Sequence, residues 1–337
     1  MRKNKWSLFL IVSYILIAAC YTLYSFSQID LNLTLSSNGI YQSFQKVLIR
    51  LGYFNRPLST LFYILIVFLF FTVYSLLFIS FKKKRFSLKK LWWLVGLTIG
   101  FLIISYPALS HDIFNYMFNA KMVLLYRRNP HIYVALNFPH DTWVRFMHNV
   151  HTPAPYFYGW TVLSLIPSVI SLNKIIPNII NFKLFEIPFF VWQIYLLNKI
   201  LGKLIPEERL ERLFLFVLNP LVLIEVFGNG HNDLTMTSLA LGSLWFLIKE
   251  EKISIKNFLL SIFFLLLSAS IKYVTIILLP VYLIYAYIRM RYSASDPDLV
   301  GRVEKYRNIF YSRLVRQLAD FARTIINDIG GCAAIIL

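Results

Sequence analysis

The sequence is poor in acidic residues and in charge of either sign. Only 16 of its 337 residues are Asp or Glu, and charged types make up 15% of the chain, whereas apolar types make up 58%. A soluble fold of this size needs more charge to cover its surface, but a bundle surrounded by lipid does not. The composition therefore excludes a string of soluble domains and predicts a polytopic membrane protein.

Cysteine is nearly absent, and so is the alternating pattern of a transmembrane barrel. Cys20 and Cys332 lie near opposite ends of the chain, so neither a disulfide framework nor a zinc site can be built from them. The apolar stretches are long and unbroken, whereas barrel strands alternate apolar and polar residues. The expected fold class is therefore all-α.

Lysine and arginine, by contrast, are abundant, and the formal net charge is +18. Such a charge could indicate a nucleic-acid partner, but the basic residues gather beside apolar stretches, at residues 2–5, 82–90 and 289–323. This is the positive-inside pattern of cytoplasmic flanks. We therefore expect a multi-pass protein of a prokaryotic plasma membrane, with a cytoplasmic N-terminus and no nucleic-acid partner.

The apolar stretches predict about eight spans and one re-entrant or interfacial helix. The first three spans cover residues 6–26, 58–81 and 91–109, with an amphipathic interfacial helix over 41–52. Later apolar stretches occupy residues 159–172, 175–201, 213–228, 234–248, 257–271 and 273–288. If all six cross, residues 228–233 are cytoplasmic. The first of them is too short to span and contains Pro167, so we prefer the arrangement in which it does not cross and 228–233 is extracytoplasmic.

Two parts of the chain follow from this pattern. Residues 1–290 form the membrane domain, which includes a large extracytoplasmic loop over 110–158 after the third span. Residues 291–337 form a basic cytoplasmic tail. Its end, 330–337, has the composition of the beginning of another span, which leaves open that a longer protein is truncated there.

Acidic residues are rarest in the first half of the chain, which makes Asp112 a candidate for chemistry. The first 185 residues contain only Asp30, Asp112 and Asp141. Asp112 follows the outer end of the third span, where partial desolvation can raise the basicity of a carboxylate that accepts a proton from an attacking hydroxyl. The alternative is a capping aspartate for a helix that begins at Ile113.

A second candidate is the turn Gly228-Asn229-Gly230-His231-Asn232-Asp233. Two glycines permit a tight turn with positive φ, and three polar side chains with ligand chemistry follow. One of them would suffice as a cap for the next helix, so a binding function and a capping function both remain open. In the preferred topology this turn and Asp112 reach the same side of the membrane.

Isolated charges within apolar stretches form a third group. Lys183 and Glu186 have the i, i+3 spacing of a helical ion pair. Glu225 and Lys272 have no such neighbour, and Lys272 either snorkels to the interface or binds a phosphate. Five histidines lie in the loop 110–158, but they lack the spacing of a zinc site. We expect neither a protein-bound metal nor a cofactor.

Several short motifs carry a resemblance to a known family. In chain order they are Ser110-His111-Asp112-Ile113-Phe114-Asn115-Tyr116, Asn129-Pro130-His131-Ile132-Tyr133, Thr152-Pro153-Ala154-Pro155-Tyr156-Phe157-Tyr158-Gly159, Asn219-Pro220-Leu221, the turn 228–233 and Lys272-Tyr273. Over about residues 90–285 the sequence resembles the GT-C membrane glycosyltransferases. It is most similar to bacterial polyprenyl-phosphate-mannose-dependent mannosyltransferases of the lipoglycan-synthesis type.

The resemblance implies a GT-C-like fold and an inverting transfer of a hexose, expected to be mannose, from a polyprenyl-phosphate donor to an extracytoplasmic glycolipid or glycan. It implies Asp112 as the catalytic base. The residues expected to bind substrate are His111, Tyr116, Arg127, Arg128, Tyr158, His231, Asn232, Asp233 and Lys272. Of these, Arg127, Arg128 and Lys272 are the candidate cations for the donor phosphate. The main alternative is a transporter or flippase of a lipid-linked sugar.

Overall fold

The computed structural model describes residues 2–31, 33, 35–84, 87–250 and 253–291, and every regular element within them is helical. The main helices are α1 (Arg2–Ser25), α2 (Gly39–Ile49), α3 (Arg56–Lys82), α4 (Leu88–Ile104), α5 (Asp112–Leu124), α6 (Tyr158–Ile170), α7 (Ile175–Leu204), α8 (Arg209–Val217), α9 (Pro220–Leu223), α10 (Asp233–Ile248), α11 (Ile255–Ala269) and α12 (Leu279–Arg291). Short 3₁₀ or π segments are η1 (Phe26–Gln28), η2 (Arg50–Phe54), η3 (Ala135–Asn137), η4 (Thr142–Phe146), η5 (Pro206–Glu208), η6 (Ile224–Gly228) and η7 (Tyr273–Leu278). The expected all-α class is confirmed for this part of the chain.

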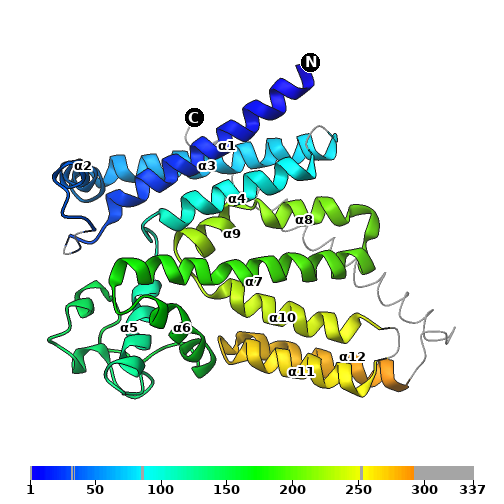
Figure 1. Cartoon of the computed structure of the whole chain (residues 1–337). Coiled ribbons are helices and arrows are strands. Elements are labelled where there is room, and N and C mark those ends of the chain that lie inside the picture. Colours follow the sequence, from blue (N-terminus) through cyan, green and yellow to red (C-terminus); the bar gives the residue numbers. More distant parts are fainter. Residues whose placement is uncertain (1, 32, 34, 85–86, 251–252, 292–337) are drawn as a thin grey trace, which may run out of the picture.

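The long helices lie roughly side by side in layers (Figure 1). Helices α1, α3 and α4 form one layer, and α7 crosses the middle of the molecule. Helices α10 and α11 pack together on the other side of α7. Helices α2, α5 and α6 gather at one end, together with the irregular chain between α5 and α6.

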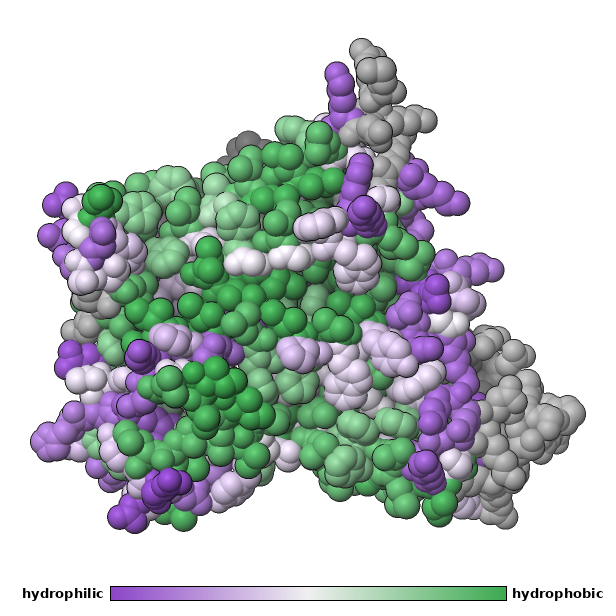
Figure 2. Space-filling view, in the orientation of Figure 1, coloured by the Kyte–Doolittle hydropathy of each residue, from purple (hydrophilic) through white to green (hydrophobic). Residues whose placement is uncertain are grey.

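Three segments are long and apolar enough to cross a membrane: Lys5–Gln28, Arg56–Lys82 and Ile175–Leu204. A broad apolar band covers the visible face between two polar ends (Figure 2). The chain is therefore a membrane protein with several apolar helices, while the number of spans remains a prediction. The predicted span 213–228 is divided into α8, α9 and η6, because Pro220 has no N–H with which to continue a helix.

Contacts of the basic residues show which helix ends lie together. Lys82 at the end of α3 lies 3.1 Å from Glu211 of α8. Lys203, near the end of α7, donates to the carbonyl oxygen of Lys249 after α10 at 3.0 Å. The basic residues after α3, α7 and α10 therefore share one end, as the arrangement with a non-crossing 159–172 requires. The side of the membrane that this end faces remains a prediction.

The expected outer loop 110–158 begins with a buried helix. Within α5, every residue from Ile113 to Met122 is buried, because α6 and α7 pack against it. A helix also forms in the segment expected to be interfacial, where α2 continues into the π-helical η2.

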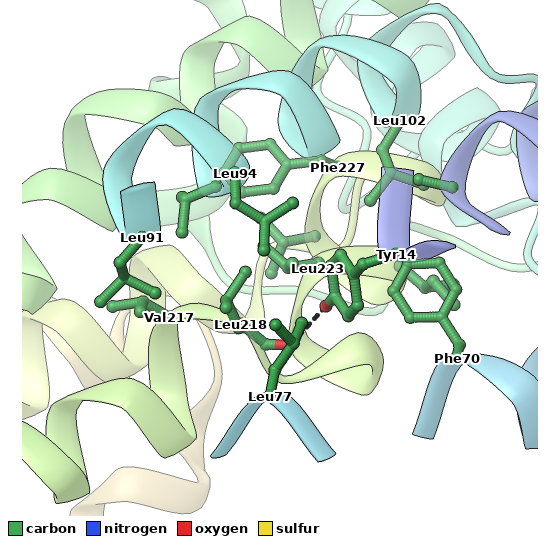
Figure 3. Packing of buried hydrophobic residues seen from close by; sticks show 14 of the residues in the cluster. Tyr14, Phe70, Leu77, Leu91, Leu94, Leu102, Val217, Leu218, Leu223 and Phe227 are labelled. Atoms are coloured by element: carbon green, nitrogen blue, oxygen red, sulfur yellow. Dashed lines mark hydrogen bonds between the residues drawn. The ribbon is translucent and has the colours of Figure 1, made fainter. Parts of the chain in front are cut away.

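One hydrophobic core connects the first layer to the broken segment α8–η6 (Figure 3). Tyr14 of α1 packs edge-on against Phe70 of α3 and donates its hydroxyl to the carbonyl oxygen of Leu218. Leu223 and Phe227 are fully buried in the same cluster. This packing fixes η6, which leads directly into the turn 228–233.

Two buried charges on α7 hold the segments on either side of it, and they do not pair with each other as their spacing suggested. Lys183 donates to the carbonyl oxygens of Leu102 and Ser105 at 3.2 and 2.6 Å. Glu186 accepts from the hydroxyl of Thr235 at 2.9 Å. The i, i+3 ion pair was wrong because each side chain finds a closer partner on another helix. Lys183 anchors the end of α4, which precedes Asp112, and Glu186 anchors the beginning of α10.

Candidate functional site

Asp112, the turn 228–233 and Lys272 converge at the end of the bundle opposite the basic flanks. They come from the beginning of α5, the segment between η6 and α10, and the residue before η7. An oxygen of Asp112 lies 3.9 Å from Nδ1 of His231, and Lys272 Nζ lies 2.7 Å from Oδ1 of Asp233. Residues far apart in the sequence thus form one polar cluster.

The carboxylate of Asp112 is held by a tyrosine rather than by the backbone of its own helix. Asp112 is the first residue of α5, and the N-cap residue His111 makes no side-chain capping bond. The hydroxyl of Tyr156 donates to Asp112 Oδ2 at 2.6 Å. Burial and this hydrogen bond raise the pKa of Tyr156 well above its ordinary value, so the phenol remains a donor at neutral pH. The capping interpretation of Asp112 is not what this carboxylate does.

His231 lies among three carboxylates. Its Nδ1 is 3.9 Å from Asp112 and 3.8 Å from Asp233, and its Nε2 is 3.4 Å from Glu225. Sequence reasoning treated Glu225 as an isolated charge and did not include it in the site. The π-helical turn η6 brings it to the imidazole, and such turns occur often at functional sites.

The turn itself is built to lie against α5. Gly230 has φ +77°, and a Cβ placed on it would lie 2.6 Å from Cδ1 of Ile113, so this position needs glycine. The side chain of Asn229 accepts from the N–H of Leu109 at 3.2 Å and donates to Glu225 at 3.2 Å. The chain before Asp112 is thereby joined to the turn that carries His231.

Two further predicted residues meet beneath the cluster. Tyr116 donates its hydroxyl to Oδ1 of the fully buried Asn232 at 3.4 Å. The Nδ2 atom of Asn232 is buried and has no hydrogen-bond partner. Tyr116 also packs edge-on against Tyr156 with ring centroids 5.2 Å apart, so it supports the tyrosine that holds Asp112.

The ring of Tyr156 also contacts Lys272, the cation of the cluster. The ammonium group of Lys272 lies 5.2 Å from the centroid of the Tyr156 ring. The backbone N–H groups of Phe157 and Gly159 donate to the carbonyl oxygens of Ile271 and Ser270 at 3.2 and 2.9 Å. These bonds attach the beginning of α6 to the two residues that follow α11 and directly precede Lys272.

The structure does not bring Arg127 and Arg128 into this cluster. Both lie beyond the far end of α5, and the rise of that helix separates them from Asp112 by roughly 20 Å. The guanidinium group of Arg128 instead lies over the ring of Tyr133, 5.1 Å from its centroid. Their role as cations for the donor phosphate remains a prediction that this geometry does not support, because α5 continues as a helix where the sequence suggested a loop.

Tyr158 and His111 lie at the margin of the cluster. The Tyr158 ring packs on His131 at a centroid distance of 4.0 Å, and its hydroxyl accepts from Asn129 at 3.2 Å. His111 stacks on His148 at 3.7 Å. Burial, together with the neighbouring imidazole, lowers the pKa of His111, which favours its neutral form.

A groove of about 430 Å³ leads away from the cluster between α7, α10 and the segment α8–η6. Both polar and apolar side chains line it. The lining residues are Gln193, Phe216, Leu221, Val222, Glu225, Val226, His231, Asp233, Leu234 and Thr237. The groove therefore offers both charged side chains and apolar surface, and a lipid with a polar head group needs both.

Within the described residues, no group of three or more His, Cys, Asp and Glu side chains could hold a metal ion. Of the three carboxylates near His231, two lie near Nδ1 and the third lies near Nε2. The expectation that the protein works without a metal or cofactor remains a prediction.

A helical membrane protein with a cluster of polar side chains at one end of a groove has the features of a membrane enzyme. The chain belongs to the MptA_B family, because the model of the alpha-(1->6)-mannopyranosyltransferase N-terminal domain matches residues 32–288. It is therefore a glycosyltransferase of the mannosyltransferase type. No curated protein and no solved structure was found to match it.

Proposed function

We propose that this protein transfers a mannosyl residue from a polyprenyl-phosphate donor to an extracytoplasmic glycolipid or glycan, with inversion at the anomeric carbon. The observation that carries the proposal is the contact of Asp112 with the His231 turn at the head of the apolar groove. We further propose that this end of the bundle faces the outside of a prokaryotic plasma membrane.

In the proposed reaction, an acceptor hydroxyl oxygen attacks the anomeric carbon while the bond from that carbon to the phosphate oxygen breaks. The hydroxyl proton passes to Asp112, and the polyprenyl phosphate leaves with the bonding electron pair. Tyr156 occupies Oδ2 of Asp112, so Oδ1 is the oxygen left to accept the proton. The donor brings a good leaving group, so a strong protein acid is unnecessary.

The developing charge of the phosphate needs a cation at the mouth of the groove. Lys272 supports this role because its ammonium group lies beside Asp233, which lines the groove. A phosphate oxygen would share the ammonium group with Asp233 and gain stabilisation as charge develops. The prenyl chain would run along Phe216, Leu221 and Val226.

His231 fits the role of a group that organises the charges of the cluster. Its Nδ1 faces both Asp112 and Asp233, and its Nε2 faces Glu225, so the imidazole lies between carboxylates that repel one another and the donor phosphate. An imidazole in this position can donate to a carboxylate or to a sugar hydroxyl. Its replacement should therefore affect both binding and transfer.

The test is a transfer assay with the purified chain, radiolabelled polyprenyl-phosphate-mannose and a mannose-bearing glycolipid. Asp112→Asn should lower the rate about 10²- to 10⁴-fold, as expected for loss of a general base. Glu207→Gln, which also removes one carboxylate but lies in the exposed η5, should leave the rate unchanged. Unchanged transfer in Asp112→Asn would refute the assignment of the base, and transbilayer movement of the donor without product would favour a flippase.

A further inference from the structure

A second, fully apolar groove lies between α1 and α3, well apart from the catalytic cluster. It has a volume of about 380 Å³, and Leu48 at the end of α2 contributes to its lining. Its lining residues are Ile17, Cys20, Leu23, Tyr24, Leu48, Leu51, Phe62, Leu65, Ile66 and Leu69. None of them lines the groove at His231. In a membrane, a groove with this lining receives a hydrocarbon chain rather than water.

The end of this groove near α2 adjoins a second hollow, whose lining includes two polar side chains. Leu51 lines both the apolar groove and a hollow of about 530 Å³, which is also lined by Arg50, Phe54, Asn55 and Leu58. Arg50 is exposed there, and Oδ1 of Asn55 accepts from the N–H of Leu58. The amide N–H₂ of Asn55 and the guanidinium group of Arg50 are therefore both donors at the mouth of an apolar channel.

The charge around the mouth is predominantly positive. Lys46, Arg50 and Arg56 all lie within α2, η2 and the beginning of α3, whereas Asp30 is the only acidic residue among the first 111. Arginine with neighbouring amide donors is well suited to bind a phosphate group. An apolar channel beneath a cationic mouth matches an amphiphile with an anionic head.

Close packing between elements builds the mouth. A Cβ placed on Gly52 would lie 1.8 Å from the carbonyl oxygen of Ser27, so η2 is packed directly on the chain after α1. The hydroxyl groups of Tyr24 and Ser59 lie 3.1 Å apart and join α1 to α3 beside the groove. Preorganisation of this kind lowers the entropic cost of binding.

We propose that this groove is a binding site for an anionic phospholipid of the leaflet at that end of the bundle. One acyl chain lies between α1 and α3, and the phosphate contacts Arg50 and Asn55. The site is separate from the proposed donor groove, so it does not depend on the proposed reaction. The bound lipid would fill the space between α1 and α3 beneath α2.

Bromolipid quenching tests the site, because Cys20 lines the groove and is exposed. The full chain with Cys332→Ser is labelled at Cys20 with bimane and reconstituted in phosphatidylcholine vesicles. Phosphatidylglycerol brominated on its acyl chains should quench the fluorescence saturably at low mole fraction. Arg50→Gln should weaken this binding about tenfold, whereas Arg145→Gln, an exposed arginine in the loop before α6, should not change it.

Native mass spectrometry gives an independent measure that does not rely on the label. Leu65→Trp should fill the groove and abolish the retained phosphatidylglycerol, whereas Phe68→Trp, which is 65% exposed on the same helix but outside the groove, should retain it. The proposal would be overturned if quenching rose only in proportion to the mole fraction of brominated lipid and was equal for brominated phosphatidylglycerol and brominated phosphatidylcholine. Displacement of phosphatidylglycerol by equimolar polyprenyl phosphate would also overturn it, because the occupant would then be a prenyl lipid.

Discussion

At the scale of single residues, Tyr156 is the side chain that connects the two charges of the proposed reaction. Its hydroxyl donates to Asp112, and its ring lies beside the ammonium group of Lys272. A hydrogen bond to a charged group contributes about 1.5–3 kcal/mol. Tyr156 therefore acts as a positioning residue, which orients the carboxylate without touching the reacting atoms.

Tyr156→Phe removes this hydrogen bond and keeps the ring. We expect kcat to fall about tenfold or more, since the carboxylate loses its fixed orientation. KM should change little, because the ring of Tyr156 is kept and only the orientation of the carboxylate is lost. The measurement is kcat and KM for transfer, with Tyr133→Phe from the same loop as the control. A variant with normal kcat would contradict the positioning role.

Asp141 is a structural carboxylate in the same extended loop. Lys121 lies 2.6 Å from it, and Tyr126 donates to it at 2.7 Å. Burial alone would raise the pKa of Asp141, but these partners and the N–H of Trp143 outweigh burial and hold the pKa below its ordinary value. The same hydrogen bond, together with burial, raises the pKa of Tyr126 to about 12.

This lowered pKa predicts an acid-sensitive loop. A carboxylate with a depressed pKa in the folded state stabilises the fold fully above its unfolded pKa of about 3.9, and this stability is lost as the pH falls through the lower folded value. Cleavage by pepsin within residues 126–146 should therefore accelerate below about pH 4. Asp141→Asn should be cleaved readily at both pH 3 and pH 5, whereas the neighbouring His140→Gln should behave like the parent protein.

At the scale of elements, the site depends on how the turn 228–233 packs against the beginning of α5. Gly230 adopts a left-handed conformation and faces Ile113, the residue after Asp112. The buried amine of Lys183 holds the end of α4 on the other side of the same junction. The end of α4 and the beginning of α5 are thus held in place by these close contacts, and not by the polar cluster itself.

Gly230→Ala should disturb this junction. The positive φ costs an alanine about 1–2 kcal/mol, and the new methyl group would collide with Cδ1 of Ile113. We expect a lower thermal midpoint and at least a tenfold loss of transfer, measured on the same detergent-purified samples. Adding Ile113→Val, which removes Cδ1, should restore part of both losses. Gly96→Ala, where nothing lies within 4 Å of the new methyl group, is the matched control.

At the scale of the whole molecule, the two ends of the bundle have different chemistry. Basic flanks gather at the end where α3, α7 and α10 finish. The cluster of Asp112, His231 and Lys272 lies at the other end, with α2, α5 and α6. The positive-inside pattern predicts that the basic end is cytoplasmic.

Cysteine accessibility tests this orientation. In a Cys20→Ser, Cys332→Ser background, a membrane-impermeant maleimide should label Leu136→Cys and His231→Cys on intact cells. Glu207→Cys should react only after the cells are permeabilised. Labelling of position 231 from the cytoplasmic side would contradict an extracytoplasmic active site.

Much of the fold could be predicted from local sequence. The long apolar stretches predicted α1, α3 and α7 to within a few residues, because hydropathy is a property of each segment alone. The polar stretch 110–158 was a different case. It contains the buried helix α5, whose two asparagines, tyrosine and lysine are typical of an exposed loop, and only the packing of α6 and α7 against it shows that they are buried. The separation of Arg127 and Arg128 from the cluster could not be predicted for the same reason.

Only some residues of the candidate site could be predicted from the sequence. Asp112, His231, Asp233 and Lys272 were rare polar residues in an apolar chain, so they could be selected by type. Glu225 and Tyr156 could not, since one looked like an isolated charge and the other like one of many interfacial aromatics. The roles of all these residues in the reaction remain predictions, which the transfer assays above test.

The sequence by itself determined that this chain enters a membrane and that it does so as helices. It also determined which polar side chains are candidates for a functional site. These are consequences of composition and of apolar length, which act within each segment. Only the tertiary structure decided which polar groups meet, because contacts such as Tyr116 with Asn232 join residues 116 positions apart. Such contacts depend on how the helices pack, and a pattern within one segment contains no record of its distant neighbours.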